Sequence, residues 1–139
     1  MTPQNFPLFI AFLREASKLS VCKRRGVAAC LISDDLQMIG WGINSPAGNN
    51  PKLCTGIKDG CFCVHSELNC ILNSRVTATD RRHGCLMLAT RQPCRFCASV
   101  IVNCQFIKKV IYLDESEQGS LGDKILKDNH ITCEQYASS

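Results

Sequence analysis

The chain has 139 residues, of which 45% are hydrophobic and 20% charged, and this balance excludes a disordered or fibrous protein. Sixteen Lys and Arg residues against twelve Asp and Glu residues leave a net charge of +4. This mild excess suits a phosphorylated small molecule better than a long polyanion, because nucleic-acid domains usually carry a denser basic stripe. We expect a single domain over residues 1–139.

The N-terminal segment contains a short apolar run that no basic residue precedes and that Arg14 and Glu15 interrupt. We therefore expect neither a signal peptide nor a membrane span, and we expect a cytoplasmic protein without membrane association. The eleven cysteines would then be reduced thiols. Their odd number indicates metal binding plus a few buried, apolar cysteines.

The first part of the chain predicts a helix, a hairpin and a loop. Pro7 opens a pattern with apolar residues at positions 8, 9, 12, 13, 16 and 19, which is typical of a helix that covers a sheet. The apolar runs 27–33 and 37–43 flank a turn and predict a β-hairpin. Prolines and glycines throughout 44–60 predict a long loop, and such loops are often functional.

Helices and strands then alternate along the rest of the chain. We expect helices over 65–74, 94–104 and 120–128, and strands over 85–90, 109–113 and 131–135. Residues 80–83, "DRRH", are expected to form a solvated loop. Alternation of this kind predicts an α/β protein with a largely parallel sheet, covered on both faces, in which the first hairpin is antiparallel.

One imidazole and two thiols stand near the starts of two of these helices: His65, Cys94 and Cys97. Catalytic zinc is typically held by three protein ligands, and a Cys₂His set is one known form. Glu67 follows His65 closely enough to reach a water on the metal without ligating it. H-x-E with P-C-x-x-C is the zinc-deaminase pattern, in which the glutamate acts as general acid and base. The alternatives are a fold-stabilising zinc, or a buried histidine with incidental thiols.

These motifs belong to a longer stretch, from about Ser20 to Gln135, that resembles the cytidine deaminase superfamily, and most closely the deoxycytidylate (dCMP) deaminases. "HSELNCI" is similar to the family's H-A-E-x-N-A-I, and "QPCRFCASVI" is similar to its E/S-P-C-x-x-C-A-x-x-I. "CKRRGVAACLI" resembles the family's entry motif, and "FIKKVIY" with "ILKDNHI" resembles its later strand and helix. The resemblance implies a three-layer α/β/α, cytidine-deaminase-like fold with a five-stranded mixed sheet.

The resemblance also implies a reaction, the zinc-dependent hydrolytic deamination of dCMP to dUMP and ammonia in pyrimidine deoxynucleotide metabolism. Zinc on His65, Cys94 and Cys97 would activate the water that attacks C4 of the pyrimidine. Glu67 would protonate N3 and then pass a proton to the departing ammonia. The expected product is a deoxynucleotide with its phosphate unchanged.

Four further residues are implied to bind the substrate. The backbone N–H of Ser66 would contact the base carbonyl, and the carbonyl of Gln92 would accept from the exocyclic amine. Asn44 resembles an asparagine that hydrogen-bonds the sugar, although Asn-Ser-Pro is also ordinary turn chemistry. Arg24 is the candidate for the 5′-phosphate, because a guanidinium suits bidentate phosphate contact. The alternative for Arg24 is a solvated surface side chain.

A second set of thiols lies before the first strand and in the long loop: Cys22, Cys54, Cys61 and Cys63. Some dCMP deaminases hold a second, structural zinc with residues from these regions, and the resemblance implies such a zinc here. The alternative is a group of free thiols. The remaining cysteines fall in apolar patterns and are expected in the core: Cys30, Cys70, Cys85, Cys104 and Cys133.

Regulation and assembly follow from the family only in part. dCMP deaminases are hexamers that dCTP activates and dTTP inhibits, so a homo-oligomer is expected. The effector response, with Mg²⁺ accompanying the nucleotide, is open, because "GINSPAG" is one residue shorter than the family's loop between Gly42 and Pro46. A second tyrosine that the family often has after the fourth strand is also missing.

Two other functions compete with this one. The first is another deaminase of the superfamily, which would act on a nucleoside, dCTP, guanine, or a base in tRNA or single-stranded nucleic acid. One Trp and two Tyr offer little stacking surface for a nucleic-acid substrate. The second is a non-catalytic zinc-binding regulatory module. Glu67 argues against it, because a purely structural zinc has no use for that carboxylate.

Overall fold

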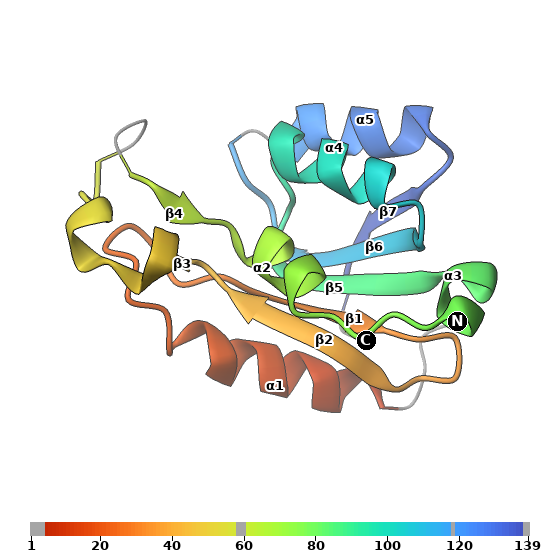
Figure 1. Cartoon of the computed structure of the whole chain (residues 1–139). Coiled ribbons are helices and arrows are strands. Elements are labelled where there is room, and N and C mark those ends of the chain that lie inside the picture. The colour runs from red at the N-terminus through yellow and green to blue at the C-terminus, as the bar shows by residue number, and fades with distance from the viewer. Residues whose placement is uncertain (1–4, 58–60, 118, 138–139) are drawn as a thin grey trace.

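A five-stranded sheet forms the frame of the computed structural model, which describes residues 5–57, 61–117 and 119–137 (Figure 1). The strands lie in the order β2-β1-β5-β6-β7. Their bounds are β1 Ala28–Ile32, β2 Met38–Ile43, β5 Cys85–Arg91, β6 Ile107–Asp114 and β7 Thr132–Gln135. The β1 strand is antiparallel to β2 and to β5, whereas β6 is parallel to β5 and to β7. The expected mixed sheet is confirmed.

The expectation of a largely parallel sheet is wrong, because parallel and antiparallel pairings are equally represented. The chain leaves β2, passes through helix α2 (Ser66–Leu72) and enters β5 on the far side of β1. A crossover of this type keeps β5 parallel to β2. Because β1 lies between them and is antiparallel to β2, it is also antiparallel to β5.

Helices cover both faces of the sheet, which confirms the three-layer arrangement (Figure 1). Helix α1 (Phe6–Ser17) packs on one face. Helices α2, α4 (Arg95–Cys104) and α5 (Gly119–Asp128) pack on the other. Among the described residues, no helix has the length and apolar character to cross a membrane.

The face of helix α1 that packs on the sheet agrees only in part with the one expected. Its buried residues are Phe6, Phe9, Ile10, Leu13 and Ala16. Leu8, a member of the predicted stripe, is 69% exposed, and Leu19, which is 64% exposed, lies beyond the end of the helix at Ser17. The buried set follows the three- and four-residue spacing of one helical face, and it begins with Phe6, which the pattern from position 8 had left out.

Residues 80–83 are helical, so the expected loop is wrong. They belong to helix α3 (Ala78–His83), which begins with a capping box. The Thr77 side chain accepts from the Asp80 N–H at 3.1 Å, and the Asp80 carboxylate accepts from the Thr77 N–H at 2.9 Å. These two bonds satisfy backbone donors that a helix start otherwise leaves without partners.

The long connection after β2 contains little regular structure. A two-stranded sheet pairs β3 (Ser45–Pro46) with β4 (Cys63–Val64). Two short 3-10 turns, Ala47–Asn49 and Pro51–Leu53, lie between these strands. The last part of the predicted loop, residues 58–60, lies outside the described residues.

The five cysteines expected in the core are found there or at its edge. Cys30, Cys70, Cys85 and Cys133 are buried. Cys104 is half-buried, and its thiol donates to the Ile101 carbonyl at 3.0 Å. These thiols therefore act as small apolar side chains within the packed layers.

Glycines on β2 let helix α2 approach the sheet closely. A Cβ placed on Gly42 would lie 2.5 Å from the Cys70 backbone nitrogen, and one on Gly40 would lie 2.7 Å from the Ser74 Cβ. Either contact is too short for a side chain. The absence of side chains at Gly40 and Gly42 therefore sets the position of α2, which begins at the predicted catalytic residues.

Candidate metal and active site

Two helix starts bring together the three residues predicted to bind zinc. His65 is the N-cap of α2 and Cys94 is the N-cap of α4, while Cys97 is buried in the first turns of α4. The His65 Nδ1 atom lies 3.2 Å from the Cys97 Sγ and 3.6 Å from the Cys94 Sγ. Side chains that are 29 and 32 positions apart in the sequence thus lie in direct contact.

The spacing of these three atoms fits a tetrahedral zinc. Zinc–sulfur and zinc–nitrogen bonds of about 2.3 and 2.0 Å place neighbouring ligand atoms about 3.5 Å apart. The three ligand atoms all lie within 4.8 Å of one another, and the two contacts of the imidazole are close to that separation. One imidazole and two thiols leave a fourth position of the tetrahedron for another ligand.

Without a metal, hydrogen bonds among these three residues favour the thiolate form of one cysteine and the protonated form of the other. The hydrogen bond from Cys97, together with that from His65, lowers the pKa of the Cys94 thiol to about 4. The pKa of Cys97 is raised by its hydrogen bond with Cys94 and by burial. The hydrogen bond with Cys94 raises the pKa of His65. Cys94 is therefore a thiolate at neutral pH, and metal binding would displace the proton of the Cys97 thiol.

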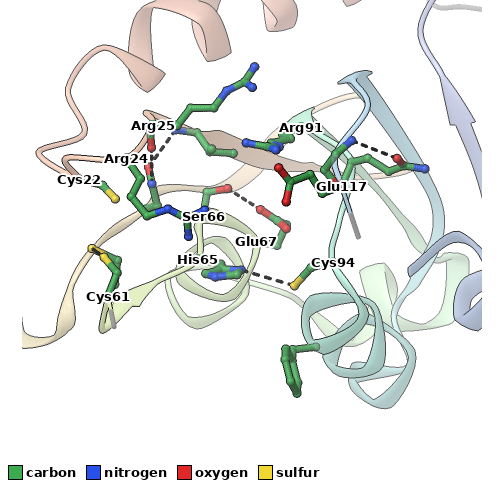
Figure 2. Close-up of a pocket in the computed structure, with 16 residues that line it drawn as sticks. Cys22, Arg24, Arg25, Cys61, His65, Ser66, Glu67, Arg91, Cys94 and Glu117 are labelled. Atoms are coloured by element: carbon green, nitrogen blue, oxygen red, sulfur yellow. Dashed lines mark hydrogen bonds between the residues drawn. The ribbon is translucent and has the colours of Figure 1, made fainter. Parts of the chain in front are cut away.

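Glu67 places a buried carboxylate beside the three ligands. It lies in the first turn of α2 and is 4% exposed. The Ser66 hydroxyl donates to its Oε1 at 2.5 Å. Figure 2 shows Glu67 between the metal ligands and the arginines of the pocket. A buried carboxylate in this position is typical of a general acid or base.

The pocket above Glu67 is about 540 Å³ in volume and is lined by cationic side chains (Figure 2). Arg24 lines it, as predicted, and so do Arg25 and Arg91, which the sequence analysis did not select. Glu117 lies on the same side as Arg91. Arg91 could have been found from its place at the carboxyl end of a strand, where α/β proteins bind their ligands.

Asn44 lines the pocket, but much of its side chain is engaged within the protein. Its Oδ1 accepts from the Val27 N–H at 2.8 Å, and its Nδ2 donates to the Arg25 carbonyl at 2.6 Å. These bonds hold the segment that carries Arg24 and Arg25 against the end of β2. A contact between Asn44 and a sugar stays a prediction.

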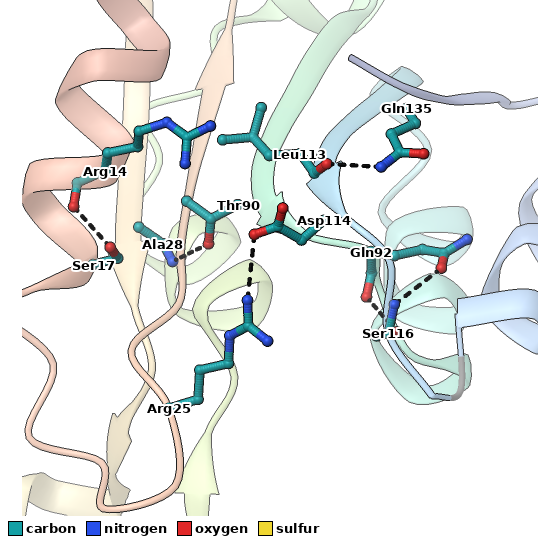
Figure 3. A network of polar contacts seen from close by, with 10 residues as sticks. All are labelled: Arg14, Ser17, Arg25, Ala28, Thr90, Gln92, Leu113, Asp114, Ser116 and Gln135. Carbon is teal, nitrogen blue, oxygen red and sulfur yellow. Dashed lines mark hydrogen bonds and ion pairs between the residues drawn. The ribbon is translucent and has the colours of Figure 1, made fainter. Parts of the chain in front are cut away.

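The two backbone groups assigned to the base also reach the pocket. Ser66 is the first residue of α2, so its N–H has no partner within the helix. The Gln92 carbonyl accepts from the Ser116 hydroxyl at 3.0 Å, which leaves its second lone pair (Figure 3). The Ser116 N–H also donates to the Gln92 Oε1 at 3.3 Å. Ser116 thereby fastens the loop after β6 to the pocket, a role that the sequence analysis missed.

The four cysteines of the second predicted set also meet. The Sγ atoms of Cys22, Cys54, Cys61 and Cys63 all lie within 4.8 Å of one another. The Sγ of Cys61 is 3.7 Å from that of Cys54 and 3.3 Å from that of Cys63. Tetrahedral zinc–sulfur geometry requires about 3.8 Å, so this donor set also fits zinc.

Hydrogen bonding also favours one thiolate in this cysteine cluster. Burial opposes ionisation of Cys61, but hydrogen bonds from Cys63 and Cys54 outweigh it and lower the pKa to about 6. The pKa of Cys63 is raised by burial and by its bond with Cys61. The cluster thus holds a thiolate near neutral pH before any metal binds.

The chain matches, over residues 7–114, the family described as the cytidine and deoxycytidylate deaminase zinc-binding region. The match covers most of the chain and includes every residue of both cysteine-containing sets. The protein belongs to this family. The His65, Cys94 and Cys97 geometry agrees with the zinc binding that the family description states.

Individual relatives agree with the family. A probable deoxycytidylate deaminase of Caenorhabditis elegans is 33% identical over 57 residues, which make up 41% of this chain and 27% of that protein. The matched segment thus spans about a quarter of that relative. A dCMP deaminase from the cyanophage S-TIM5, solved in complex with dCMP and dUMP, has a TM-score of 0.81 and 23% identity, with 98% of this chain and 99% of that chain covered.

A more distant fold relative is a guanine deaminase from Nitrosomonas europaea. It has a TM-score of 0.59 and 12% identity, with 93% of this chain and 73% of that chain covered. At such identities, this structure and the cyanophage structure support the fold alone. The cytidine-deaminase-like fold expected from the sequence is therefore confirmed.

Proposed function

We propose that this protein is a zinc-dependent hydrolase that converts dCMP to dUMP and ammonia. The observation that carries the proposal is a buried carboxylate, Glu67, beside a zinc-compatible His65, Cys94 and Cys97 set at the base of an arginine-lined pocket. The family supports the reaction class. The C. elegans relative, named above as a probable deoxycytidylate deaminase, supports dCMP as the substrate.

Glu67 has the central part in the proposed reaction. Zinc on His65, Cys94 and Cys97 would supply a Lewis acid that makes water nucleophilic near neutral pH. Glu67 accepts a proton from the attacking water and delivers it to N3 as the C4–oxygen bond forms. It then carries a second proton, taken from the new hydroxyl on C4, to the exocyclic nitrogen, so that the C4–nitrogen bond breaks, the C4 carbonyl forms and ammonia leaves. Its burial keeps bulk water from competing for these protons.

Backbone groups orient the base in this proposal. The Ser66 N–H donates to the carbonyl at C2, and the Gln92 carbonyl accepts from the exocyclic amine. Because both groups belong to the backbone beside a metal ligand, they would align C4 with the site of attack. Asn44 is proposed for the sugar and Arg24 for the 5′-phosphate.

A second zinc in the cysteine cluster forms part of the proposal. Its support is the meeting of four thiols in a segment with little buried apolar surface. Cys22 and Cys63 lie two residues before Arg24 and His65, respectively. A metal in the cluster would therefore order two short tethers, residues 22–24 and 63–65, that lead into the active site.

Assembly and regulation are proposed from the family. Phe96 and Val100 of α4 are 62% and 39% exposed, and Leu72 of the neighbouring α2 is 77% exposed. Apolar side chains in these positions support a homo-oligomer, which sedimentation of the wild type and of Phe96→Ser would test. A response to dCTP or dTTP, with Mg²⁺ accompanying the nucleotide, stays a prediction.

Ammonia release from a matched substrate panel tests the proposed function. Zinc-loaded protein would be supplied with dCMP, dCTP, deoxycytidine, CMP, guanine, and cytosine- or adenosine-bearing oligonucleotides, with Glu67→Gln as the blank. Turnover that is fastest with dCMP supports the proposal. Turnover confined to another substrate overturns the choice of dCMP, and no turnover with any of them supports a non-catalytic zinc protein.

A further inference from the structure

The side chain of Ser66 lies next to the proposed proton carrier. Ser66 is the first residue of α2, stands between His65 and Glu67 in the sequence, and is fully buried. Its hydroxyl donates to the Glu67 Oε1 atom at 2.5 Å (Figure 2). The proposed function uses the backbone N–H of Ser66 but gives its hydroxyl no part.

Other serines in or just after the helices use their hydroxyl groups differently. Those of Ser17, Ser74 and Ser99 donate to the carbonyl of a residue three or four positions earlier, at 2.7 or 2.8 Å. This is an ordinary bond for a serine that follows a helical turn. Ser66 has no turn of α2 before it, and its hydroxyl is bonded to a carboxylate instead. Hydrogen bonds to ionised acceptors are roughly twice as strong as those between neutral groups.

The bond from Ser66 engages one of the two oxygens of a carboxylate that lines the active-site pocket. Glu67 lines this pocket together with His65 and Cys94, and it is 4% exposed. The last side-chain torsion of a glutamate is broad, so a carboxylate without partners can present either oxygen to a ligand. The bond to Oε1 narrows this rotation. Oε2 is then the oxygen that keeps its full capacity for the reacting groups.

We propose that Ser66 is a positioning residue whose hydroxyl holds the Oε1 atom of Glu67, so that Oε2 carries the protons of the reaction. This inference rests on the proposed function, in which Glu67 takes a proton from water and delivers it to N3. Each proton then arrives at and leaves from the same oxygen. Such fixed geometry increases the fraction of bound substrate that is ready to react, so loss of the hydroxyl should lower kcat more than it raises KM.

Steady-state kinetics on Ser66→Ala test the role of the hydroxyl. The substitution removes one oxygen atom and keeps the backbone N–H that is proposed to contact the base. We expect kcat for dCMP to fall by about 10- to 30-fold, as for the loss of a hydrogen bond to a charged group, and KM to stay within about 3-fold. Zinc content should match that of the wild type. A kcat within about 2-fold of wild type would overturn the inference.

Ser99→Ala is the matched control. Ser99 lies in α4, the helix that carries Cys97, and its hydroxyl donates to the Arg95 carbonyl at 2.8 Å. It is exposed and does not line the pocket. Its loss should leave kcat and KM within about 2-fold of the wild-type values. A fall in kcat as large as that of Ser66→Ala would show that hydroxyl groups on these helices act through local structure, and would overturn a specific role for Ser66.

A double-mutant cycle separates an effect through Glu67 from a general effect on the pocket. Glu67→Gln has no proton carrier for the Ser66 hydroxyl to position. Adding Ser66→Ala to Glu67→Gln should therefore change the residual rate by less than about 2-fold. A further fall as large as that seen when Glu67 is present would mean that Ser66 acts independently of Glu67, and would overturn the inference.

Carbon NMR of the Glu67 carboxylate tests the contact without any need for turnover. In protein with ¹³C-labelled glutamate carboxylates, the Glu67 signal is identified by its loss in Glu67→Gln. Ser66→Ala should shift this signal and Ser99→Ala should not, whereas an unshifted signal in Ser66→Ala would overturn the inference. If dCMP is not deaminated but the shift is present, the proposed function fails and the positioning of Glu67 stands. If dCMP is deaminated and Ser66→Ala keeps the wild-type kcat, the inference fails and the proposed function stands.

Discussion

The proposed catalytic set, which comprises Glu67 and the ligands His65, Cys94 and Cys97, and the cysteine cluster have similar ligand spacing but differ in the structure that supports them. His65, Cys94 and Cys97 stand at the starts of helices that pack on the central sheet. The cysteine cluster is assembled from the segment before β1, the long loop and the two-residue strand β4. The comparison teaches that packed helices position one set of ligands, whereas the other set lies on segments with little regular structure, where we expect a bound metal to contribute more to local order.

The two regions are nevertheless joined by short tethers. Cys63 precedes His65 by two residues, and Cys22 precedes Arg24 by two. Backbone bonding adds a further link, since the Lys23 N–H donates to the Cys54 Sγ at 3.2 Å. We therefore expect disruption of the cysteine cluster to shift Arg24 and His65 without removing any group that takes part in the proposed reaction.

The largest effect is expected within the catalytic set. Glu67→Gln removes the proton carrier but keeps the shape, so kcat for dCMP should fall by about 10³-fold or more. Zinc content should stay at the wild-type value, because Glu67 does not supply a ligand in the proposed site. Steady-state kinetics with metal analysis would check this, and a kcat within 10-fold of wild type would contradict the proton-transfer role.

A smaller loss is expected when the cysteine cluster is broken. Cys61→Ser should lose one equivalent of zinc and expose the long loop to protease, because the loop buries little apolar surface. Because Cys22 and Cys63 lie two residues before Arg24 and His65, we also expect kcat/KM for dCMP to fall, by about 10-fold. This is the usual size of effect when a residue that supports a metal site is changed.

Metal analysis, limited proteolysis and kinetics would measure these three effects of Cys61→Ser. Cys104→Ser, which alters a half-buried thiol outside both clusters, is the control and should keep the wild-type zinc content. Wild-type zinc content in Cys61→Ser would contradict a metal site in the cysteine cluster.

The pH dependence of alkylation should distinguish the two regions in the metal-free protein. The pKa of Cys94 is lowered to about 4 and that of Cys61 to about 6. Only the thiolate reacts, so between pH 5 and 7 the rate at Cys61 should rise about 10-fold, while the rate at Cys94 changes by less than about 1.5-fold. Rates at both sites would be followed by peptide mass spectrometry with iodoacetamide.

Zinc provides the control for the alkylation experiment. Metal bound by either set should protect its own thiols, and Cys30 should stay unreactive throughout because burial raises its pKa to about 12. Parallel pH profiles for Cys94 and Cys61 would contradict the difference in thiolate character between the two regions.

The smallest effect is expected at a third region, far from both metal sets. Thr77→Ala removes the capping box of α3 and should lower the free energy of unfolding by about 1 kcal/mol. For a chain of this size, that corresponds to a fall of about 3 °C in Tm. Zinc content and kcat should be unchanged. A change in either would show that α3 influences the active site, which its place at the other end of the sheet does not suggest (Figure 1).

The metal-binding residues could be predicted from the sequence because their chemistry is local. H-x-E and P-C-x-x-C place a ligand and a carboxylate, or two thiols, within a turn of each other in any helix that begins there. The position of α3 could also have been predicted, since Thr77 and Asp80 have the spacing of a capping box. The order of strands could not, because the β1–β2 hairpin has two free edges, one on each strand, and both offer backbone groups with which β5 could pair.

The amino-acid sequence alone predicted most of the helices and strands, the two sets of side chains that could bind a metal, and Glu67 as the expected general acid and base. These depend on residue type and short spacing. Only the tertiary structure decided which residues share the pocket, such as Arg91 and Glu117, or which contact fastens a loop, such as that of Ser116 with Gln92. Such neighbours lie far apart in the chain, and the packing of the sheet and its crossovers sets the distances between them.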